Sequence, residues 1–218
     1  MKSIFTILIV TVSIFAIDIN NNFGVKGSGE IITKTINPKQ SFQKVSSDLS
    51  ANITIRHSNQ NLISIKTDKN ILDKITLYIK HNTLFISAND SIIPTKLNIA
   101  IGMVNLNEIR AYGALDIKTE NFNIDNLLLD INGASTIRLI NTKIKKLNIK
   151  ADGTFNIICN KNCSIQKSYI KTDGVGDILL NVNTLLKLDV SGTINLKYRG
   201  KPQIQKRVEG ILNLTPLK

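Results

Sequence analysis

The sequence is poor in the residues that build metal sites, disulfide scaffolds and base-stacking surfaces. Its 218 residues include two cysteines, two histidines and no tryptophan, and aromatic residues make up only 5%. So few cysteines and histidines exclude a disulfide-rich scaffold and leave little for a metal cage. The shortage of aromatic side chains argues against binding of nucleic acid. We therefore expect no cofactor and no nucleic-acid partner.

Acidic residues are also few, since 16 Asp and Glu stand against 28 Lys and Arg, a net charge of +12. Hydrophobic residues at 42% and charged residues at 20% exclude both a disordered chain and an integral membrane protein. The length suits one domain or at most two. Because no linker-like segment divides the chain, we predict a lead-in over residues 17–26 and one domain over 27–218.

The first residues have the pattern of an export signal. Lys2 precedes a charge-free apolar run that ends before Asp18, and this run is shorter than the roughly 20 residues that span a bilayer. We interpret residues 1–16 as a signal peptide cleaved after Ala16, although Ile14 is larger than the usual residue at its position. The alternative is a retained N-terminal anchor. With cleavage, the mature chain has no transmembrane span and lies in the periplasm, the outer envelope or outside the cell.

The second half contains a repeat of six segments, each of which aligns on a glycine. Apolar residues stand two and four positions before the glycine and four positions after it, except for Thr172 and Lys206. Apolar residues two apart are typical of strands, and repeats of this length are typical of β-solenoid coils. The glycines lie 20, 20, 21, 18 and 18 residues apart, at Gly113, Gly133, Gly153, Gly174, Gly192 and Gly210.

This repeat predicts an all-β fold, a parallel β-helix whose apolar columns face one core. The column four residues after the glycines should be buried throughout, from Ile117 to Leu214. We expect each glycine to stand at a corner that needs a positive φ. The members of the buried column are Ile117, Ile137, Ile157, Ile178, Leu196 and Leu214.

Two outward columns support the stacking of coils. The column three residues before the glycines runs from Arg110 to Arg207, and four of its five neighbouring pairs are opposite in charge, which predicts weak ion pairs between coils. The column three residues after the glycines is polar and predicts a ladder of side-chain hydrogen bonds. Its members are Asp116, Thr136, Asn156, Asp177, Asn195 and Asn213.

The first half also alternates apolar and polar residues, but without a period. We predict that it forms additional coils or an antiparallel cap, less regular than the repeat, over one end of the solenoid. His81 and Asn82 indicate a turn between two of its strands.

These motifs, in their order and spacing, resemble the putative auto-transporter adhesin, head GIN domain family, over about Gly27 to Leu214. That family repeats a Ser-Gly-Ala-Gly-Asp-Val-like motif. The resemblance implies a right-handed parallel β-helix and an exported location, and it implies no chemistry. The matching segments are Tyr-Gly-Ala-Leu-Asp-Ile (112–117), Asn-Gly-Ala-Ser-Thr-Ile (132–137), Asp-Gly-Val-Gly-Asp-Ile (173–178), Gly27-Ser-Gly29, Asn-Ile-Leu-Asp-Lys-Ile (70–75) and Tyr-Arg-Gly-Lys-Pro (198–202).

Many β-helices act on acidic polysaccharides, so a catalytic site is a further hypothesis for this sequence. Glycoside cleavage needs two carboxyl groups about 5–9.5 Å apart, whereas Asp116 and Asp177 would stand three coils apart, about 14 Å at the strand spacing. Asp152 and Asp173 form a nearer acidic pair, which we interpret as corner residues that satisfy backbone N–H groups. The chain has no phosphate-binding loop, and its two histidines have no ordered nucleophile beside them. We predict no catalytic residues.

Cys159 and Cys163 are separated by three residues, so a redox role, which favours C-x-x-C spacing, is not indicated. A short-loop disulfide and two separate thiols both remain open.

Basic residues form two clusters that could bind anionic envelope or host-surface polymers, or be solvated surface. The first comprises Lys143, Lys145, Lys146 and Lys150, and the second Lys197, Arg199, Lys201, Lys206 and Arg207. Our leading hypothesis is an exported, non-enzymatic binding module of the bacterial envelope or surface that resembles an adhesin. A carbohydrate-active enzyme and a purely structural envelope protein are the alternatives.

Overall fold

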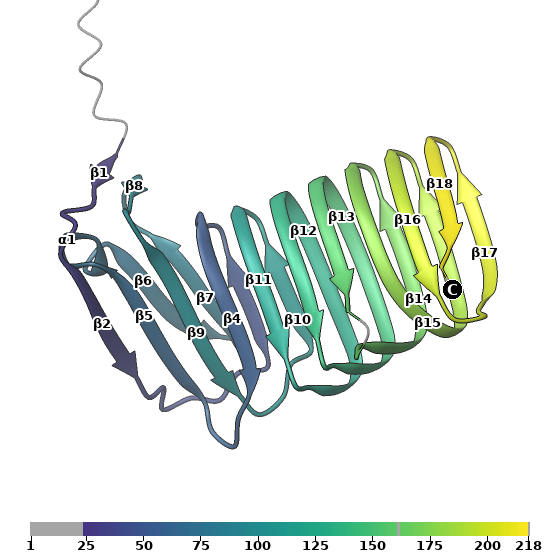
Figure 1. Cartoon of the computed structure of the whole chain (residues 1–218). Coiled ribbons are helices and arrows are strands. Elements are labelled where there is room, and N and C mark those ends of the chain that lie inside the picture. Colours follow the sequence, from purple (N-terminus) through teal and green to yellow (C-terminus); the bar gives the residue numbers. More distant parts are fainter. Residues whose placement is uncertain (1–23, 161, 218) are drawn as a thin grey trace, which may run out of the picture.

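The structure is a computed structural model that describes residues 24–160 and 162–217. The expected signal peptide, residues 1–16, lies outside the described residues, as does most of the lead-in. Parallel strands form stacked coils in the second half, and a less regular group of strands covers their first coil (Figure 1). The repeat's prediction of a β-solenoid with an irregular N-terminal β region is therefore confirmed.

The solenoid makes about five turns and all of its strand pairs are parallel. Residues in neighbouring coils pair at the offsets of the sequence alignment, as Ile117 with Ile137 and Ile157 with Ile178. Its strands are β10 (Glu108–Ala111), β11 (Ala114–Glu120), β12 (Asn123–Ile140), β13 (Lys143–Cys159), β14 (Ser164–Thr172), β15 (Val175–Val190), β16 (Thr193–Arg199), β17 (Gln203–Val208) and β18 (Ile211–Pro216).

Each coil has two long sides and a short one. We call the side before the corner glycine face A; it contains β10, β14, β17 and the matching parts of β12, β13 and β15. Face B follows the glycine and contains β11, β16, β18 and the later part of β12 and of β13 together with the first part of β15. The third side is short and includes Ile124, Ile144 and Ile165, which pair in register and are buried.

The predicted buried column on face B is confirmed for five of its six members. Ile117, Ile137, Ile157, Ile178 and Leu196 are at most 2% exposed and pair from coil to coil. Leu214 pairs with Leu196 but is only half-buried, because no described coil packs beyond it. The column continues in the other direction into Ile53 and Ile99 of the first half.

The corner glycines are needed for close packing rather than for a left-handed backbone, which corrects our expectation. Of the six, only Gly153 has a φ in the left-handed region. A Cβ at Gly192 would lie 1.9 Å from the carbonyl oxygen of Gly174, and one at Gly113 would lie 2.0 Å from that of Leu49. The backbones of successive coils approach so closely at this corner that a side chain does not fit.

The first half contributes two further coils and an antiparallel cap, so both forms that the sequence left open are present. β3 and β7 extend face A, while β4 and β9 extend face B, all in parallel pairing. β5 and β2 then add to β9, and β6 to β7, in antiparallel pairing. His81 and Asn82 have positive φ in the turn between β6 and β7, as predicted. The elements are β1 (Val25–Lys26), β2 (Ile31–Ile36), β3 (Lys44–Ser47), β4 (Ala51–His57), β5 (Leu62–Asp68), α1 (Lys69–Leu72), β6 (Ile75–Lys80), β7 (Thr83–Ala88), β8 (Ile92–Ile93) and β9 (Leu97–Met103).

Asp68 fastens the outermost segments of this cap. Its buried carboxylate accepts hydrogen bonds from the Gly29 N–H, the Thr95 N–H and the Thr95 hydroxyl at 2.7–2.8 Å. Burial alone raises the pKa of Asp68, but these hydrogen bonds outweigh it and hold the pKa below its ordinary value. Gly27 packs against this carboxylate, and a Cβ there would lie 2.5 Å from it. The Gly27–Gly29 segment of the family resemblance is thus anchored by one acidic side chain.

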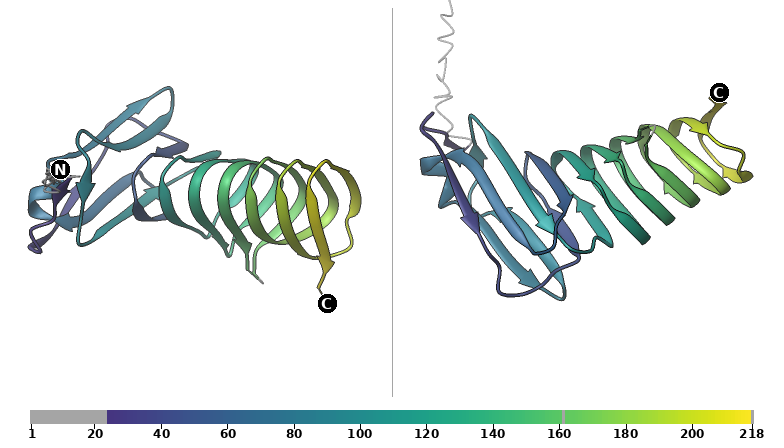
Figure 2. Two further views of the ribbon diagram at one scale, coloured as in Figure 1. Left: turned by 90° about the horizontal axis from the view of Figure 1, so that it is seen from above. Right: turned by 60° about the horizontal axis from the view of Figure 1, so that its bottom comes forward.

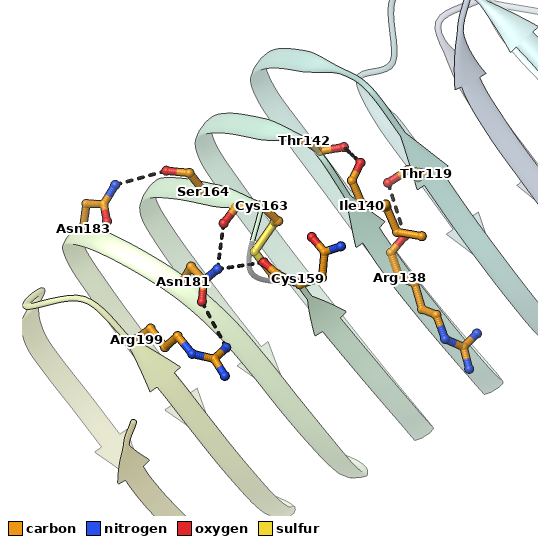
Figure 3. Close-up of a disulfide and its surroundings, with 11 residues drawn as sticks. Thr119, Arg138, Ile140, Thr142, Cys159, Cys163, Ser164, Asn181, Asn183 and Arg199 are labelled. Carbon is orange, nitrogen blue, oxygen red and sulfur yellow. Dashed lines mark hydrogen bonds between the residues drawn. A yellow bond between two sulfur atoms is a disulfide. The ribbon is translucent and has the colours of Figure 1, made fainter. Parts of the chain in front are cut away.

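A disulfide joins Cys159 and Cys163 at the corner between face B and the third side (Figure 3), so the first of the two alternatives that the sequence left open is present. In the two preceding coils this corner holds Asn121 and Asn141, both with positive φ. The amide of Asn181 from the next coil donates to the carbonyl oxygens of Asn160 and Cys163, both at 2.8 Å (Figure 3). The disulfide therefore closes a slightly longer corner on which the next coil packs.

Candidate binding surface

The polar column of face B forms the predicted ladder over parts of its length. The Asn195 amide donates to Asp177, and the Asn213 amide donates to Asn195, at 3.0 and 2.8 Å. In the first half, Asn52 donates to Asn98 at 3.2 Å, so the ladder extends beyond the repeat. These side chains are occupied in holding coils together.

The acids of this column are not arranged for catalysis. Asp116 forms an ion pair with Arg138, and Asp177 lies three coils away within the ladder. Asp152 and Asp173 are exposed, and in the described part of the chain their carboxylates accept no hydrogen bond, so the role expected for them at backbone N–H groups is not seen. Across residues 24–160 and 162–217, no group of three His, Cys, Asp or Glu side chains could hold a metal ion.

The end of face A nearest the cap carries charges that neutralise one another. Glu108 lies 2.5 Å from Arg110 and 3.1 Å from Lys44. Burial raises the pKa of Glu108, but these two cations outweigh it, so its pKa lies below its ordinary value. The Tyr112 hydroxyl donates to Asp130 at 3.1 Å, and burial together with this carboxylate raises the pKa of Tyr112.

These contacts replace the ion pairs that the sequence predicted between coils. Arg110 pairs in register with Asp130 but bonds to Glu108, two residues away on its own strand. Arg207, at the other end of the same column, forms an ion pair with Glu209. Opposite charges do lie in register in four of the five neighbouring pairs of this column. The arginine side chains nevertheless bind acids close to them along the chain, Glu108 and Glu209, instead of acids in the next coil.

The middle of face A has a different composition, because five exposed lysines surround the half-buried ring of Tyr169. Within the part of the chain that the structure describes, none of the five forms an ion pair. One of them, Lys146, places its Nζ 4.9 Å from the centre of the Tyr169 ring. We call this set the Tyr169 cluster; it consists of Tyr169, Lys146, Lys150, Lys167, Lys171 and Lys187.

The structure divides the two basic clusters expected from the sequence among different sides of the solenoid. From the first cluster, only Lys146 and Lys150 lie on face A, whereas Lys143 and Lys145 line a groove on the third side with Asp125. Lys145 forms an ion pair with Asp125 at 2.8 Å. The first cluster is therefore not a single surface.

The second cluster is divided in the same way. Lys197 and Arg199 belong to β16 on face B, where the Arg199 guanidinium donates to Asn181 at 3.5 Å. Lys201 lies in the turn that follows, and Lys206 and Arg207 lie in β17 on face A, in the last coil. Lys150 and Arg207 do share one outward column, as expected, through Lys171 and Asp189.

Sequence analysis missed three lysines of the Tyr169 cluster, Lys167, Lys171 and Lys187, as candidate binding residues. Lys171 stood in the aligned charged column, and Lys167 pairs with Lys146 at the equivalent position of the next coil. If the alignment is extended three or four residues further toward the N-terminus of each segment, the lysines of neighbouring coils fall in the same columns. Lysines that are close along the chain do not share a surface here, because consecutive residues in a strand point to opposite sides or lie beyond a corner.

Comparison with known families decides the identity of the fold. The model of the putative auto-transporter adhesin, head GIN domain family matches residues 41–202. The chain belongs to this family. The head GIN match covers five of the six repeat segments and much of the N-terminal cap, and it confirms the resemblance drawn from the motifs.

Solved structures share this fold at low sequence identity. A putative adhesin from Bacteroides fragilis has a TM-score of 0.75 and 24% identity, covering 89% of this chain and 100% of that chain. A putative lipid binding protein from Parabacteroides distasonis has a TM-score of 0.61 and 16% identity, and a putative adhesin from Parabacteroides merdae 0.56 and 20%; each covers 89% of this chain and 99% of its own. No curated protein matches the chain. In the described residues no helix is both long enough and apolar enough to cross a membrane.

Proposed function

We propose that this head GIN protein is an exported, non-enzymatic binding module of the bacterial envelope or surface, and that it adheres to anionic polymers through face A. One observation carries the proposal: in the described residues the lysines in the middle of this face form no ion pair, although Lys150 and Lys171 stand in register with Asp130 and Asp189, whereas charges at its two ends are paired. Unpaired cations on a continuous sheet surface attract an extended polyanion, and many weak contacts add up along it.

The other hypotheses from the sequence receive less support. An enzyme would need a carboxyl pair with a free face; Asp116 is bound by Arg138 and Asp177 by Asn195, so this alternative rests on the exposed pair Asp152 and Asp173 alone. A purely structural protein would not need a concentration of uncompensated positive charge, because like charges directly opposite each other in a sheet lower its stability. The adhesin names of the family and of its structural neighbours agree with a binding role.

Retention of the purified protein on an immobilised anionic polysaccharide, eluted with a salt gradient, tests the proposal. One variant replaces Lys146, Lys150, Lys167, Lys171 and Lys187 with glutamine. A matched control removes the same charge elsewhere, by replacing Lys118, Lys143, Lys145, Lys197 and Lys201 with glutamine. We expect the first variant to elute at much lower salt than the control, because binding through phosphate- or carboxylate-lysine contacts weakens steeply with salt. Equal shifts in both variants would show that only net charge matters, and absence of retention would remove the binding role.

Export has its own test. Mass spectrometry of the protein isolated from its native envelope should find a chain that begins after residue 16. An intact Met1 on membrane-bound material would establish the anchor instead.

A further inference from the structure

The Tyr169 cluster is a two-dimensional array whose geometry follows from strand pairing. Tyr169 lies in β14, between Asn148 of β13 and Lys187 of β15 in the same outward column. Lys167 and Lys171 are its neighbours two residues away on the same strand, on the same face of the sheet. The aromatic ring is therefore enclosed by positive charge on its own strand and on both neighbouring strands.

Two pairs of these lysines face each other directly across the strands. Lys146 pairs with Lys167, and Lys150 pairs with Lys171, at the strand spacing of about 4.8 Å. Like charges in this position repel, which lowers the stability of the sheet. Neighbouring positions on face A show that this chain can place acids beside its cations, since Glu108 lies against Lys44 and Arg110. The repulsion is thus confined to one area, and a bound anion would relieve it.

Tyr169 gives this area a second chemical character. Tyr169 is half-buried in an outward column, and the Lys146 ammonium lies over its ring, where a cation is attracted to the ring face. The flat apolar ring also suits the C–H face of a sugar ring, which would take the place of this ammonium while Lys146 turns to the sugar's carboxylate. A ligand that offers both a sugar ring and a negative charge would use the whole cluster, whereas a chain of charges alone would use only the lysines.

The spacing of the lysines limits the type of polymer. Along the solenoid axis each of two columns offers a lysine in two successive coils, Lys146 with Lys167 and Lys150 with Lys171, at a spacing of about 4.8 Å, which is close to the length of one hexopyranose unit. A polysaccharide with a carboxylate on every sugar, lying along the axis, would present carboxylates of successive sugars to the lysines of these two coils. Polyphosphate places its charges more closely and has no ring to pack on Tyr169.

Acidic residues border the cluster on two sides. Asp152 and Asp173 line a groove with Lys150 and Lys171 at the glycine corner. Asp130 and Asp189 stand at the two ends of the Lys150–Lys171 column, and Glu209, followed by Asp189, raises the pKa of Arg207. These carboxylates repel a polyanion from the corner and from the last coil, so they direct it onto Tyr169 and onto the column of Lys146 and Lys167.

We propose that the Tyr169 cluster binds a polyuronate-type polysaccharide, with the lysines holding carboxylates of successive sugars and Tyr169 packing against a sugar ring. This inference rests on the proposed function, because it names the ligand class and the residues for the same face.

The test compares binding of polygalacturonate and of polyphosphate to the full chain by titration calorimetry at fixed salt. We expect tighter binding of polygalacturonate, and about a three- to tenfold loss for Tyr169→Ala, the range of an aromatic contact of this kind. Tyr169→Phe should retain most of the affinity because it keeps the ring. Polyphosphate affinity should change less than twofold in either variant. Asp152→Asn with Asp173→Asn should strengthen polygalacturonate binding, because the acidic border is weakened.

The outcomes separate this inference from the proposed function. If polyphosphate or vesicles of phosphatidylglycerol bind more tightly than polygalacturonate, or if Tyr169→Ala weakens all ligands alike, the polyuronate assignment is wrong while adhesion to polyanions stands. If no polyanion binds even at low salt, the proposed function fails. Thermal unfolding of each variant, followed by circular dichroism, must match that of the unsubstituted protein, and a shifted transition in Tyr169→Ala leaves Tyr169→Phe and the Asp152/Asp173 variant to decide.

Discussion

The two halves of the molecule build one continuous core by different routes. From β10 onward the coils stack in chain order, and every strand pair is parallel. In the first half, β4 lies between β9 and β11 although it precedes β9 in the chain, and β5 and β2 then pair in antiparallel fashion. Figure 2 shows the regular row of coils joined to this less regular end. A regular stack needs a sequence period, whereas the end of the stack needs long-range pairings that have none.

Core truncation should give the largest effect and shows whether the halves unfold together. Ile157→Ala should lower the free energy of unfolding by about 2–5 kcal/mol, because the side chain is fully buried. Ile99→Ala removes a member of the same column in the first half and should cost a similar amount. Chemical denaturation of both should show one transition at reduced midpoint. Two transitions, with each variant shifting only its own, would mean that the halves are separate folding units.

Leu214→Ala supplies the control for this pair. The side chain belongs to the same column but is half-buried at the last coil, so its truncation should cost clearly less. A cost equal to that of Ile157→Ala would mean that the last coil is covered in solution.

Glycine substitution should distinguish the repeat from the cap. Gly192→Ala places a Cβ against the Gly174 carbonyl oxygen and should destabilise the protein by about 1–3 kcal/mol through overpacking of backbone against backbone. A Cβ at Gly102 in β9 would have the Ser58 side chain, at 3.2 Å, as its nearest neighbour. Gly102→Ala should therefore lower the stability much less than Gly192→Ala. Thermal melting compares the two, and equal losses would contradict the close-approach explanation of the corner glycines.

Acidification should weaken the cap through Asp68. Because hydrogen bonds lower its pKa in the folded state, Asp68 stabilises the fold at a pH above its ordinary pKa near 3.8, and this contribution is lost as the pH falls through the lower, folded-state pKa. Asp68→Asn should therefore destabilise the protein at pH 7, with a difference from the unsubstituted protein that shrinks toward pH 2. Thermal melts of both proteins recorded across this pH range check the trend.

The ladder should give the smallest effect. Asn195→Ala removes two exposed side-chain hydrogen bonds in the repeat, and Asn98→Ala removes one in the first half. Each should cost at most about 0.5–1.5 kcal/mol, since exposed groups regain water as a partner. Asn195→Ala should therefore lower the denaturation midpoint more than Asn98→Ala does. The reverse result would show that the ladder contributes more to stability in the cap than in the repeat.

Much of the solenoid could be predicted because one residue type repeats at one offset. The apolar residues four places after each glycine dictated the buried column, and Asn195 and Asn213 stood in a polar column that does form a ladder. The sequence placed the corner glycines correctly, but it did not reveal why glycine is needed there. The close approach of Gly174 to Gly192 involves a neighbouring coil 18 residues away. The place of β4 could not be predicted either, since no local pattern distinguishes a strand that pairs with its successor from one inserted between later strands.

The candidate site shows the same division. The sequence indicated basic residues and an outward charged column, but it grouped Lys145 with Lys146, which lie on different sides of the coil. Only the register of β13, β14 and β15 brings Lys146, Lys167 and Lys187 around Tyr169.

The sequence by itself determined that the chain forms β-solenoid coils. Apolar residues two apart indicate strands that bury one side, and among repeat folds a period of about 20 residues with this pattern fits the β-solenoid. The tertiary structure decided which charges meet. Lys145 is neutralised by Asp125 and Glu108 by two cations, while four of the five lysines around Tyr169 face each other in two pairs. That distribution depends on which coil lies beside which and where each corner turns, and contacts between residues some 20 positions apart become visible only when the coils are stacked.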